Sequence, residues 1–220
     1  MTRRELARLL DHSVLAPEAT ARDILAGADV VREWAIGFYC VQAGWVRSAA
    51  DALAGCDALT IAVAGFPHGC ERSEVKARSA SLSVEDGARE IDMVMNFGAL
   101  KSGDSSLVAD DIAAVVRAVE GIPVKVILEA SALSDDEKRL ACRIARDAGA
   151  AFVKTSTGFH PTGGATVADV RLMRAEVGAQ MGVKASGRIR ALADALAMVE
   201  AGANRIGTSS SAAILSALSV

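Results

Sequence analysis

The sequence predicts an α/β fold, a single (β/α)8 TIM barrel domain spanning residues 1–220, and three observations support it. Eight short apolar runs alternate with longer helical segments along the chain, which is typical of a closed parallel barrel. No Pro- or Ser-rich linker and no charge run marks a domain boundary. The pair Val-Lys recurs at intervals of 29 and 30 residues, about the length of one strand–helix unit.

The main alternative is a doubly wound open sheet. Such a sheet typically has a Gly-rich phosphate-binding turn after its first strand. Here the first predicted strand leads into Ala-Pro-Glu-Ala-Thr at residues 16–20. The single barrel is therefore the better prediction.

The predicted strands are brief, apolar and rich in Val or Ile, as expected for strands covered on both faces. In chain order they are residues 11–15, 37–41, 59–64, 90–95, 124–128, 152–156, 182–184 and 205–207. The helical segments between them are residues 21–34, 71–87, 106–119, 134–148, 167–177 and 191–201, and a final helix follows residues 206–211. Ser134, three residues before Glu137, predicts a capping box, and glycines follow several helix ends.

The composition excludes several classes of protein. Hydrophobic residues make up 51% of the 220 residues, too many for a disordered chain, and the net charge is −3. No apolar run of about 18 residues occurs, so we expect no membrane partner. The scattered charge and the 4% aromatic content also argue against a nucleic-acid partner. The charged start at residues 1–5 lacks a following apolar region, which predicts no secretory signal and a cytoplasmic protein.

Cysteine and histidine patterns give no metal motif. The four cysteines, Cys40, Cys56, Cys70 and Cys142, have no C-x-x-C spacing and are expected to be reduced thiols. The three histidines, His12, His68 and His160, form no metal-binding pattern. We therefore expect no metal site.

Three lysines, Lys125, Lys154 and Lys184, lie in successive predicted strands directly after a Val. Because side chains alternate along a strand, equivalent positions could point the same way, toward the mouth of the barrel. A single lysine of this kind usually reaches outward or pairs with a carboxylate. Several in matching positions favour a shared interior site, where burial or a neighbouring cation lowers an amine pKa.

Asp92 is the obvious carboxylate partner, because it also lies within an apolar strand. Lysines beside a buried acid indicate amine catalysis, in which a neutral lysine attacks a carbonyl to form a Schiff base. The residues alone leave open which of the three lysines is the nucleophile. Asp11 and Glu129, each near a strand end, are expected to support the network or to serve as caps and ion-pair partners.

The last two strands end in small residues that suit a phosphate. Ala-Ser-Gly at residues 185–187 and Gly-Thr-Ser-Ser-Ser at residues 207–211 each precede a helical stretch. Backbone N–H groups at such helix starts bind phosphate, and barrels often place that site after strands seven and eight.

These residues together resemble deoxyribose-phosphate aldolase, a family of lysine-dependent class I aldolases. The resemblance rests on segments that run in order across nearly the whole chain: residues 11–15 (DHSVL), 65–69 (GFPHG), 90–103 (EIDMVMNFGALKSG), 124–129 (VKVILE), 152–158 (FVKTSTG), 183–187 (VKASG) and 206–210 (IGTSS). It implies a barrel enzyme, a lyase, that reversibly cleaves 2-deoxy-D-ribose 5-phosphate into acetaldehyde and D-glyceraldehyde 3-phosphate in deoxyribonucleotide catabolism. It also implies no metal or organic cofactor and a homo-oligomer, a dimer or tetramer.

The resemblance assigns roles to individual residues. Lys154 matches the Schiff-base nucleophile, Lys184 matches the second lysine that perturbs it and assists proton transfer, and Asp92 matches the acid/base. Residues in segments that contact the substrate phosphate are Gly158, Gly187, Arg188, Gly207, Ser209 and Ser210. Residues expected to support the site are Asp11, Cys40, Lys125 and Thr155.

Some positions depart from the family pattern. Arg188 stands where the family usually has a second glycine, and its guanidinium is expected to reach the phosphate. Ser211 stands where a glycine is common. Two other functions stay open: a class I aldolase with a different phosphorylated acceptor, and a barrel that binds sugar phosphates without catalysis. Asp92, Lys154 and Lys184 argue against the second, because binding alone does not require buried amines beside one another.

Overall fold

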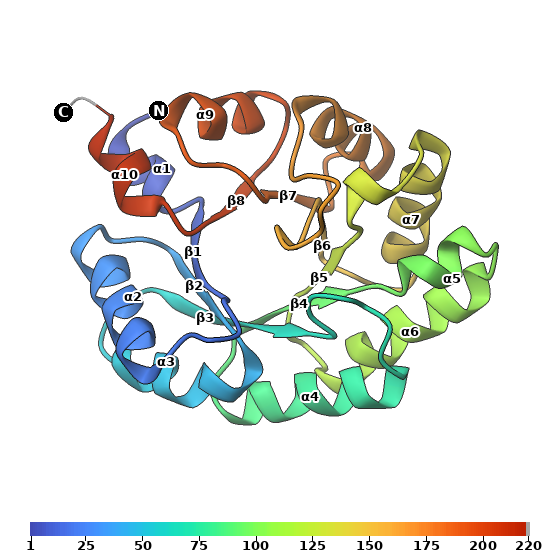
Figure 1. Cartoon of the computed structure of the whole chain (residues 1–220), viewed down its shortest axis with the longest axis horizontal. Coiled ribbons are helices and arrows are strands. Elements are labelled where there is room, and N and C mark those ends of the chain that lie inside the picture. Colours follow the sequence, from blue (N-terminus) through green and yellow to red (C-terminus); the bar gives the residue numbers. More distant parts are fainter. Residues whose placement is uncertain (219–220) are drawn as a thin grey trace.

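Eight parallel strands form one closed barrel in the computed structural model, which describes residues 1–218 (Figure 1). Each strand pairs with the next in the chain, and β8 returns to pair with β1, which closes the ring. The strands are β1 (Leu10–Val14), β2 (Phe38–Val41), β3 (Leu59–Ala64), β4 (Glu90–Val94), β5 (Val124–Ile127), β6 (Phe152–Lys154), β7 (Gly182–Ser186) and β8 (Arg205–Thr208). The predicted TIM barrel is confirmed, and the open sheet is not formed.

Helices surround the strands as an outer ring (Figure 1). The helices are α1 (Arg3–Ala7), α2 (Ala21–Glu33), α3 (Val46–Ala52), α4 (Ser73–Glu85), α5 (Phe97–Lys101), α6 (Ser105–Ala118), α7 (Asp135–Asp147), α8 (Val167–Val177), α9 (Leu192–Glu200) and α10 (Ser211–Ser216), with 3-10 turns η1 (Ala43–Trp45) and η2 (Ala130–Ala132). The predicted capping box at the start of α7 is confirmed, because Ser134 and Glu137 cap each other's backbone N–H. None of the helices among residues 1–218 is long and apolar enough to cross a membrane.

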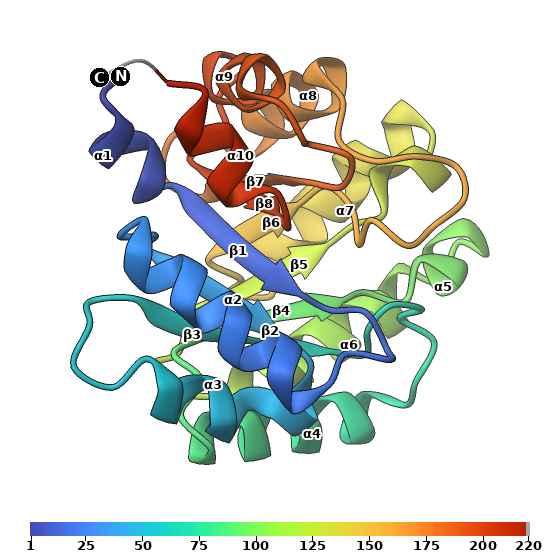
Figure 2. The ribbon, with the colours of Figure 1, turned by 60° about the vertical axis from the view of Figure 1, so that its left-hand side comes forward.

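The two ends of the described chain lie side by side (Figure 2). Arg3 in α1 donates to the backbone carbonyls of Leu215 (3.1 Å) and Leu218 (2.7 Å). This contact ties α1 to α10 next to the junction of β1 and β8. The short helix α1 was not predicted, although Thr2 and Glu5 form a capping box at its start.

The predicted strand at residues 152–156 is two residues too long. β6 ends at Lys154, and Thr155 then bonds sideways to β7, where its hydroxyl donates to the Ser186 carbonyl at 3.0 Å. The chain turns away at Gly158, whose φ of +85° favours glycine. The strand therefore stops where its side chains begin to build the mouth of the barrel.

The barrel interior is layered, as in other TIM barrels, with alternate strands supplying the side chains of one layer. The first residue of each even-numbered strand forms the layer at the N-terminal end: Phe38, Glu90, Phe152 and Arg205. The third residue of the same strands forms a layer nearer the mouth: Cys40, Asp92, Lys154 and Gly207. Between them lie Asp11, Lys125 and Lys184 from odd-numbered strands. Most of these side chains are charged, which concentrates ionisable groups in a closed space.

Candidate active site

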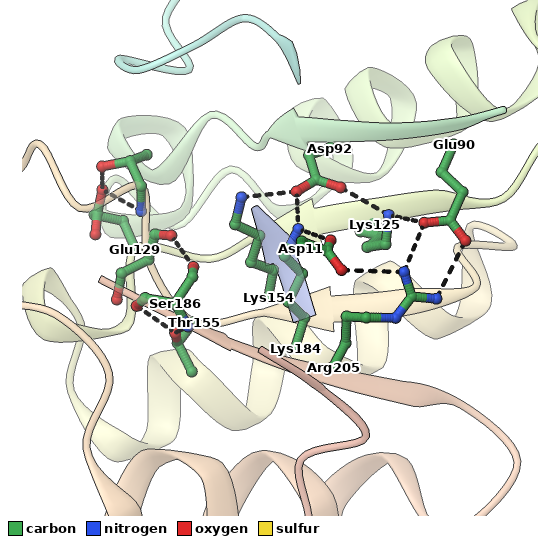
Figure 3. A network of polar contacts seen from close by, with 12 residues as sticks. Asp11, Glu90, Asp92, Lys125, Glu129, Lys154, Thr155, Lys184, Ser186 and Arg205 are labelled. Carbon is green, nitrogen blue, oxygen red and sulfur yellow. Dashed lines mark hydrogen bonds and ion pairs between the residues drawn. The ribbon is translucent and has the colours of Figure 1, made fainter. Parts of the chain in front are cut away.

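Three lysine side chains meet at one buried carboxylate, that of Asp92 in β4 (Figure 3). Lys125 donates to Oδ1 at 2.9 Å, whereas Lys154 and Lys184 both donate to Oδ2 at 2.7 Å. These lysines come from β5, β6 and β7, so neighbouring strands bring them together. The expectation that the repeated Val-Lys pairs share one site is met by this geometry.

Two further carboxylates and an arginine extend the network toward the N-terminal end of the barrel (Figure 3). Asp11 pairs with Lys184 through one oxygen, and its other oxygen accepts from Arg205 at 3.2 Å. Glu90 Oε2 lies 2.5 Å from the Lys125 ammonium nitrogen. The two carboxylate oxygens of Glu90 also accept hydrogen bonds from the two Nη atoms of Arg205, at 3.0 and 3.2 Å. We call these seven side chains the barrel ion network: Asp11, Glu90, Asp92, Lys125, Lys154, Lys184 and Arg205.

The barrel ion network contains four basic groups and three carboxylates, so one amine is in surplus. Lys125, Lys184 and Arg205 each contact two carboxylates. Among the described residues, Lys154 contacts one carboxylate oxygen, Asp92 Oδ2, and shares it with Lys184. Because an unpaired buried charge is costly, the group with the weakest compensation gives up its proton most readily. That group is Lys154.

The pKa values in the network follow the same order. Burial lowers the pKa of Lys154 below its usual value. The Asp92 carboxylate opposes this shift and the Lys184 ammonium adds to it, and the lowering prevails. Burial acts on Lys184 too, but Asp11 and Asp92 outweigh it and raise the pKa of Lys184. Burial also opposes ionisation of Asp92, yet the three lysines hold its pKa well below the usual value. The site therefore pairs a neutral-prone amine with a firmly protonated one across an ionised carboxylate.

A cavity of about 620 Å³ opens from the C-terminal mouth of the barrel to these amines. Lys154, Lys184, Asp11 and Cys40 lie at its base, and residues of the loops after β1, β6, β7 and β8 form its walls. Lys125 is fully buried and belongs to the network but not to the cavity lining. A small molecule entering the mouth can therefore reach Lys154 and Lys184 but not Lys125.

The loops after β6 and β7 approach so closely that glycines are required between them. A Cβ on Gly164 would lie 2.3 Å from the Gly187 carbonyl oxygen, and a Cβ on Gly187 would lie 3.3 Å from Gly158 Cα. Gly158 and Gly187 also have φ values of +85° and +89°. This backbone contact shapes one wall of the cavity.

The residues expected to contact a phosphate line the cavity, with one exception. The cavity lining includes Gly158, Gly187, Arg188, Gly207 and Ser209. Ser210 is not part of the lining; its N–H donates to Thr208 Oγ1 at 2.9 Å at the start of α10. Arg188 is exposed, and its backbone takes the left-handed conformation with φ of +63°. The arginine therefore occupies a backbone conformation that favours glycine.

The residues that were predicted to support the site lie in different parts of it. The Cys40 thiol lines the cavity, but burial, followed by the Asp92 charge, raises its pKa to about 11, so it stays protonated at neutral pH. Thr155 bridges β6 to β7 and lies behind the cavity wall. Glu129 accepts from the Thr157 hydroxyl at 2.5 Å, and this contact fixes the loop after β6.

Sequence reasoning missed Glu90 and Arg205 as members of the site. Glu90 lies two residues before Asp92, so the period of two along a strand could have placed both on one face. Arg205 lies two residues before Gly207 in the same way. The sequence analysis also did not identify His12 as a site residue; His12 lines the cavity and contacts Ser211 Oγ at 3.1 Å. No three metal-ligating side chains gather as a cation site within residues 1–218.

Comparison with known proteins identifies the family. A family model described as DeoC/LacD family aldolase matches residues 5–217. The chain is 53% identical over 211 residues to the deoxyribose-phosphate aldolase of Streptococcus pneumoniae serotype 19F (strain G54), which is 96% of each chain. The tetrameric deoxyribose phosphate aldolase of Aeropyrum pernix superposes with a TM-score of 0.91 at 32% identity, covering 98% of this chain and 91% of that one. The aldolase QR15 superposes with a TM-score of 0.92 at 36% identity, covering 96% and 94%. The match over nearly the whole chain shows that this protein belongs to the DeoC/LacD family of aldolases.

Proposed function

We propose that this chain is a deoxyribose-phosphate aldolase, a lyase that reversibly cleaves 2-deoxy-D-ribose 5-phosphate into acetaldehyde and D-glyceraldehyde 3-phosphate. The observation that carries the proposal is the surplus amine of the barrel ion network: Lys154 has one shared carboxylate contact and faces the cavity. A neutral amine at the base of a cavity is the group that a Schiff-base aldolase needs. The relatives from Streptococcus pneumoniae and Aeropyrum pernix are named deoxyribose-phosphate aldolases.

The reaction begins with attack of the neutral Lys154 amine on C1 of the open-chain sugar phosphate. The resulting carbinolamine loses water and becomes an iminium, and the Lys184 ammonium supplies the proton that lets the hydroxyl leave. Lys184 is suited to this step because Asp11 and Asp92 keep it protonated until it acts.

Cleavage of the C2–C3 bond follows. The C3 hydroxyl proton passes to Asp92 through a water, the C3–O electrons form the carbonyl of glyceraldehyde 3-phosphate, and the C2–C3 electrons move into the iminium to give an enamine. This step removes one positive charge from beside Asp92, so the affinity of Asp92 for a proton rises as the bond breaks. Asp92 returns its proton through the water to C2 of the enamine, which becomes an iminium again. Addition of water to this iminium releases acetaldehyde and the neutral Lys154 amine, and the proton freed in this hydrolysis restores the Lys184 ammonium. The iminium is the electron sink, so these steps need no metal or organic cofactor.

The phosphate is assigned to the wall formed by the loops after β6, β7 and β8. Gly158, Gly187 and Gly207 line the cavity and carry no side chain that would separate a phosphate from their backbone. Arg188 also lines the cavity, with its guanidinium near the Pro161 carbonyl, at 3.5 Å. Ser209 contributes hydroxyl and N–H groups near the start of α10. Ser210, which does not line the cavity and whose N–H donates to Thr208 Oγ1, supports the turn that presents Ser209. Cys40, Lys125 and Thr155 support the site without reacting. We further infer a cytoplasmic enzyme that works as a homo-oligomer, with neither nucleic acid nor membrane as partner.

Borohydride trapping tests the proposal. The protein is incubated with acetaldehyde and reduced, and the modified peptide is mapped by mass spectrometry. A single adduct on Lys154 is expected, absent in Lys154→Ala and retained in the control Lys101→Ala, whose lysine is exposed on α5. An adduct on Lys125 or Lys184, or no adduct, would contradict the assignment. Comparing kcat/KM across phosphorylated aldehyde acceptors distinguishes this enzyme from an aldolase with another acceptor.

A further inference from the structure

The layer at the N-terminal end of the barrel holds one arginine between two aromatic rings. The Arg205 guanidinium carbon lies 3.3 Å from the centre of the Phe38 ring and 5.3 Å from the centre of the Phe152 ring. Glu90 binds the guanidinium through both carboxylate oxygens. Arg205 is thus held by all three other members of its layer, and its position is fixed by stacking and by paired hydrogen bonds.

This layer lies one step below the reactive amines and is joined to them by two paths. One path runs from Arg205 through Asp11 and Lys184 to Asp92. The other path runs from Glu90 through Lys125 to Asp92. Both paths end on the carboxylate that holds Lys154. Neither Arg205 nor Glu90 lines the cavity, so neither can touch a substrate in it.

We propose that Arg205 and Glu90 are positioning residues that set the charge of the barrel ion network and thereby keep the Lys154 amine neutral. With Lys154 neutral, three cations and three carboxylates balance. Removing Arg205 leaves an excess negative charge that Lys154 neutralises by taking up a proton. Removing the charge of Glu90 leaves an excess positive charge, which drives the proton off Lys154 more strongly. The inference rests on the proposed role of Lys154 as nucleophile.

Other charged or titratable groups facing Lys154 set the background for this effect. They are Asp92 from β4, Lys184 from β7, Lys125 from β5, Asp11 from β1 and the Cys40 thiol from β2. The thiol stays neutral, and the remaining groups are unchanged in variants of Arg205 or Glu90. A unit charge at a separation on the order of 10 Å shifts a pKa by about one unit when the effective dielectric constant is about 20.

The test is the pH dependence of kcat/KM, whose acidic limb reports the protonation of the free enzyme. Arg205→Met should move that limb to higher pH by about one unit, and Glu90→Gln should move it to lower pH by a similar amount. The double variant restores the balance and should return the limb close to the wild-type position. Arg205→Lys keeps the charge and should leave the limb in place even where stability falls.

A merely structural role predicts a different pattern, in which every variant loses stability and rate while the limb stays in place. The matched control is Asp111→Asn, which removes a carboxylate from the buried Lys76–Asp111 pair (2.7 Å) outside the barrel interior. It should lower the melting temperature without moving the limb. If Arg205→Met fails to fold, Glu90→Gln still tests the proposal, because the acidic limb of its kcat/KM profile must move to lower pH.

Failure of the inference and failure of the proposed function give different results. If wild-type protein forms no borohydride-trapped adduct on Lys154, the proposed function is wrong. If the adduct forms on Lys154 in every variant but the limb moves in neither single variant, or moves in the same direction in both, only the role of Arg205 and Glu90 is refuted.

Discussion

Gly207 leaves the space that the second lysine occupies, and filling that space should slow the chemistry. A Cβ placed on Gly207 would lie 3.0 Å from Lys184 Cε and 2.9 Å from Ser186 Cβ. Carbon atoms rest about 3.5 Å or more apart, so in Gly207→Ala the Lys184 side chain must retreat by roughly 0.5 Å. Its 2.7 Å hydrogen bond to Asp92 then stretches to about 3.2 Å, the long end of the normal range.

A displacement of this size has a predictable cost in rate. If misplacing a catalytic group by about 1 Å costs about 100-fold, half that displacement costs about tenfold, equivalent to about 1.4 kcal/mol of activation free energy. The assay is the rate of acetaldehyde imine trapping together with kcat for cleavage. Acetaldehyde carries no phosphate, so a slower trapping rate separates the effect on Lys184 from any effect of Gly207 on phosphate binding.

The control is Gly44→Ala, because nothing lies within 4 Å of a Cβ at that position. It should match wild type in both measurements. A folded Gly207→Ala protein that traps acetaldehyde and turns over within twofold of wild type would refute the reasoning, since Lys184 would then tolerate displacement.

Three further changes test the barrel packing, the cavity wall and a buried histidine. In Gly182→Ala the new Cβ would lie 2.0 Å from the Phe152 ring, so overpacking should lower the stability by about 1–3 kcal/mol in denaturant titration, and an unchanged midpoint would contradict this packing. Arg188→Gly should relieve about 1 kcal/mol of left-handed backbone strain and raise the melting temperature. In the same variant, KM for the phosphorylated substrate should rise while kcat stays constant. An unaltered KM would show that Arg188 does not contact the phosphate. Burial lowers the pKa of His12 to about 4, so between pH 6.5 and 4 the unfolded chain binds a proton that the folded chain refuses, and stability falls as the pH falls. His12→Leu should flatten this part of the melting-temperature profile, by up to about 3 kcal/mol in total, and a profile with the wild-type slope would contradict it.

The fold was predictable because each strand carries its own signal. Short apolar runs and their spacing along the chain predicted all eight strands to within two residues at most of their ends. The segments that were not predicted, such as α3 (Val46–Ala52) and α5 (Phe97–Lys101), are helices of seven and five residues. A helix this short owes its formation to packing in the finished barrel, so its own sequence carries little information.

The site was predictable only in part, because some of its members signal their role through distant partners. Asp92, Lys154 and Lys184 stand out as charges inside apolar strands. Glu90 and Arg205 are the first residues of their strands, where a charged side chain ordinarily meets water. Only barrel closure brings these two together across 115 residues of chain. The choice of nucleophile needs the charge of the whole network, and no local pattern contains it.

Two buried ion clusters in this protein show why that charge matters. Outside the barrel, the Lys76 ammonium binds the Asp111 carboxylate and two backbone carbonyls at 2.7–3.0 Å, so its charge is matched and it holds the loop before α4 in place. Inside the barrel, one basic group has no carboxylate of its own. Burying a surplus charge is unfavourable, and burial lowers the pKa of Lys154, so that loss of its proton would relieve the penalty. In the proposed mechanism, the same imbalance that would destabilise a protonated Lys154 favours its nucleophilic form. The charge count shows that one amine is in surplus, and the carboxylate contacts of each lysine distinguish Lys154 from its two neighbours.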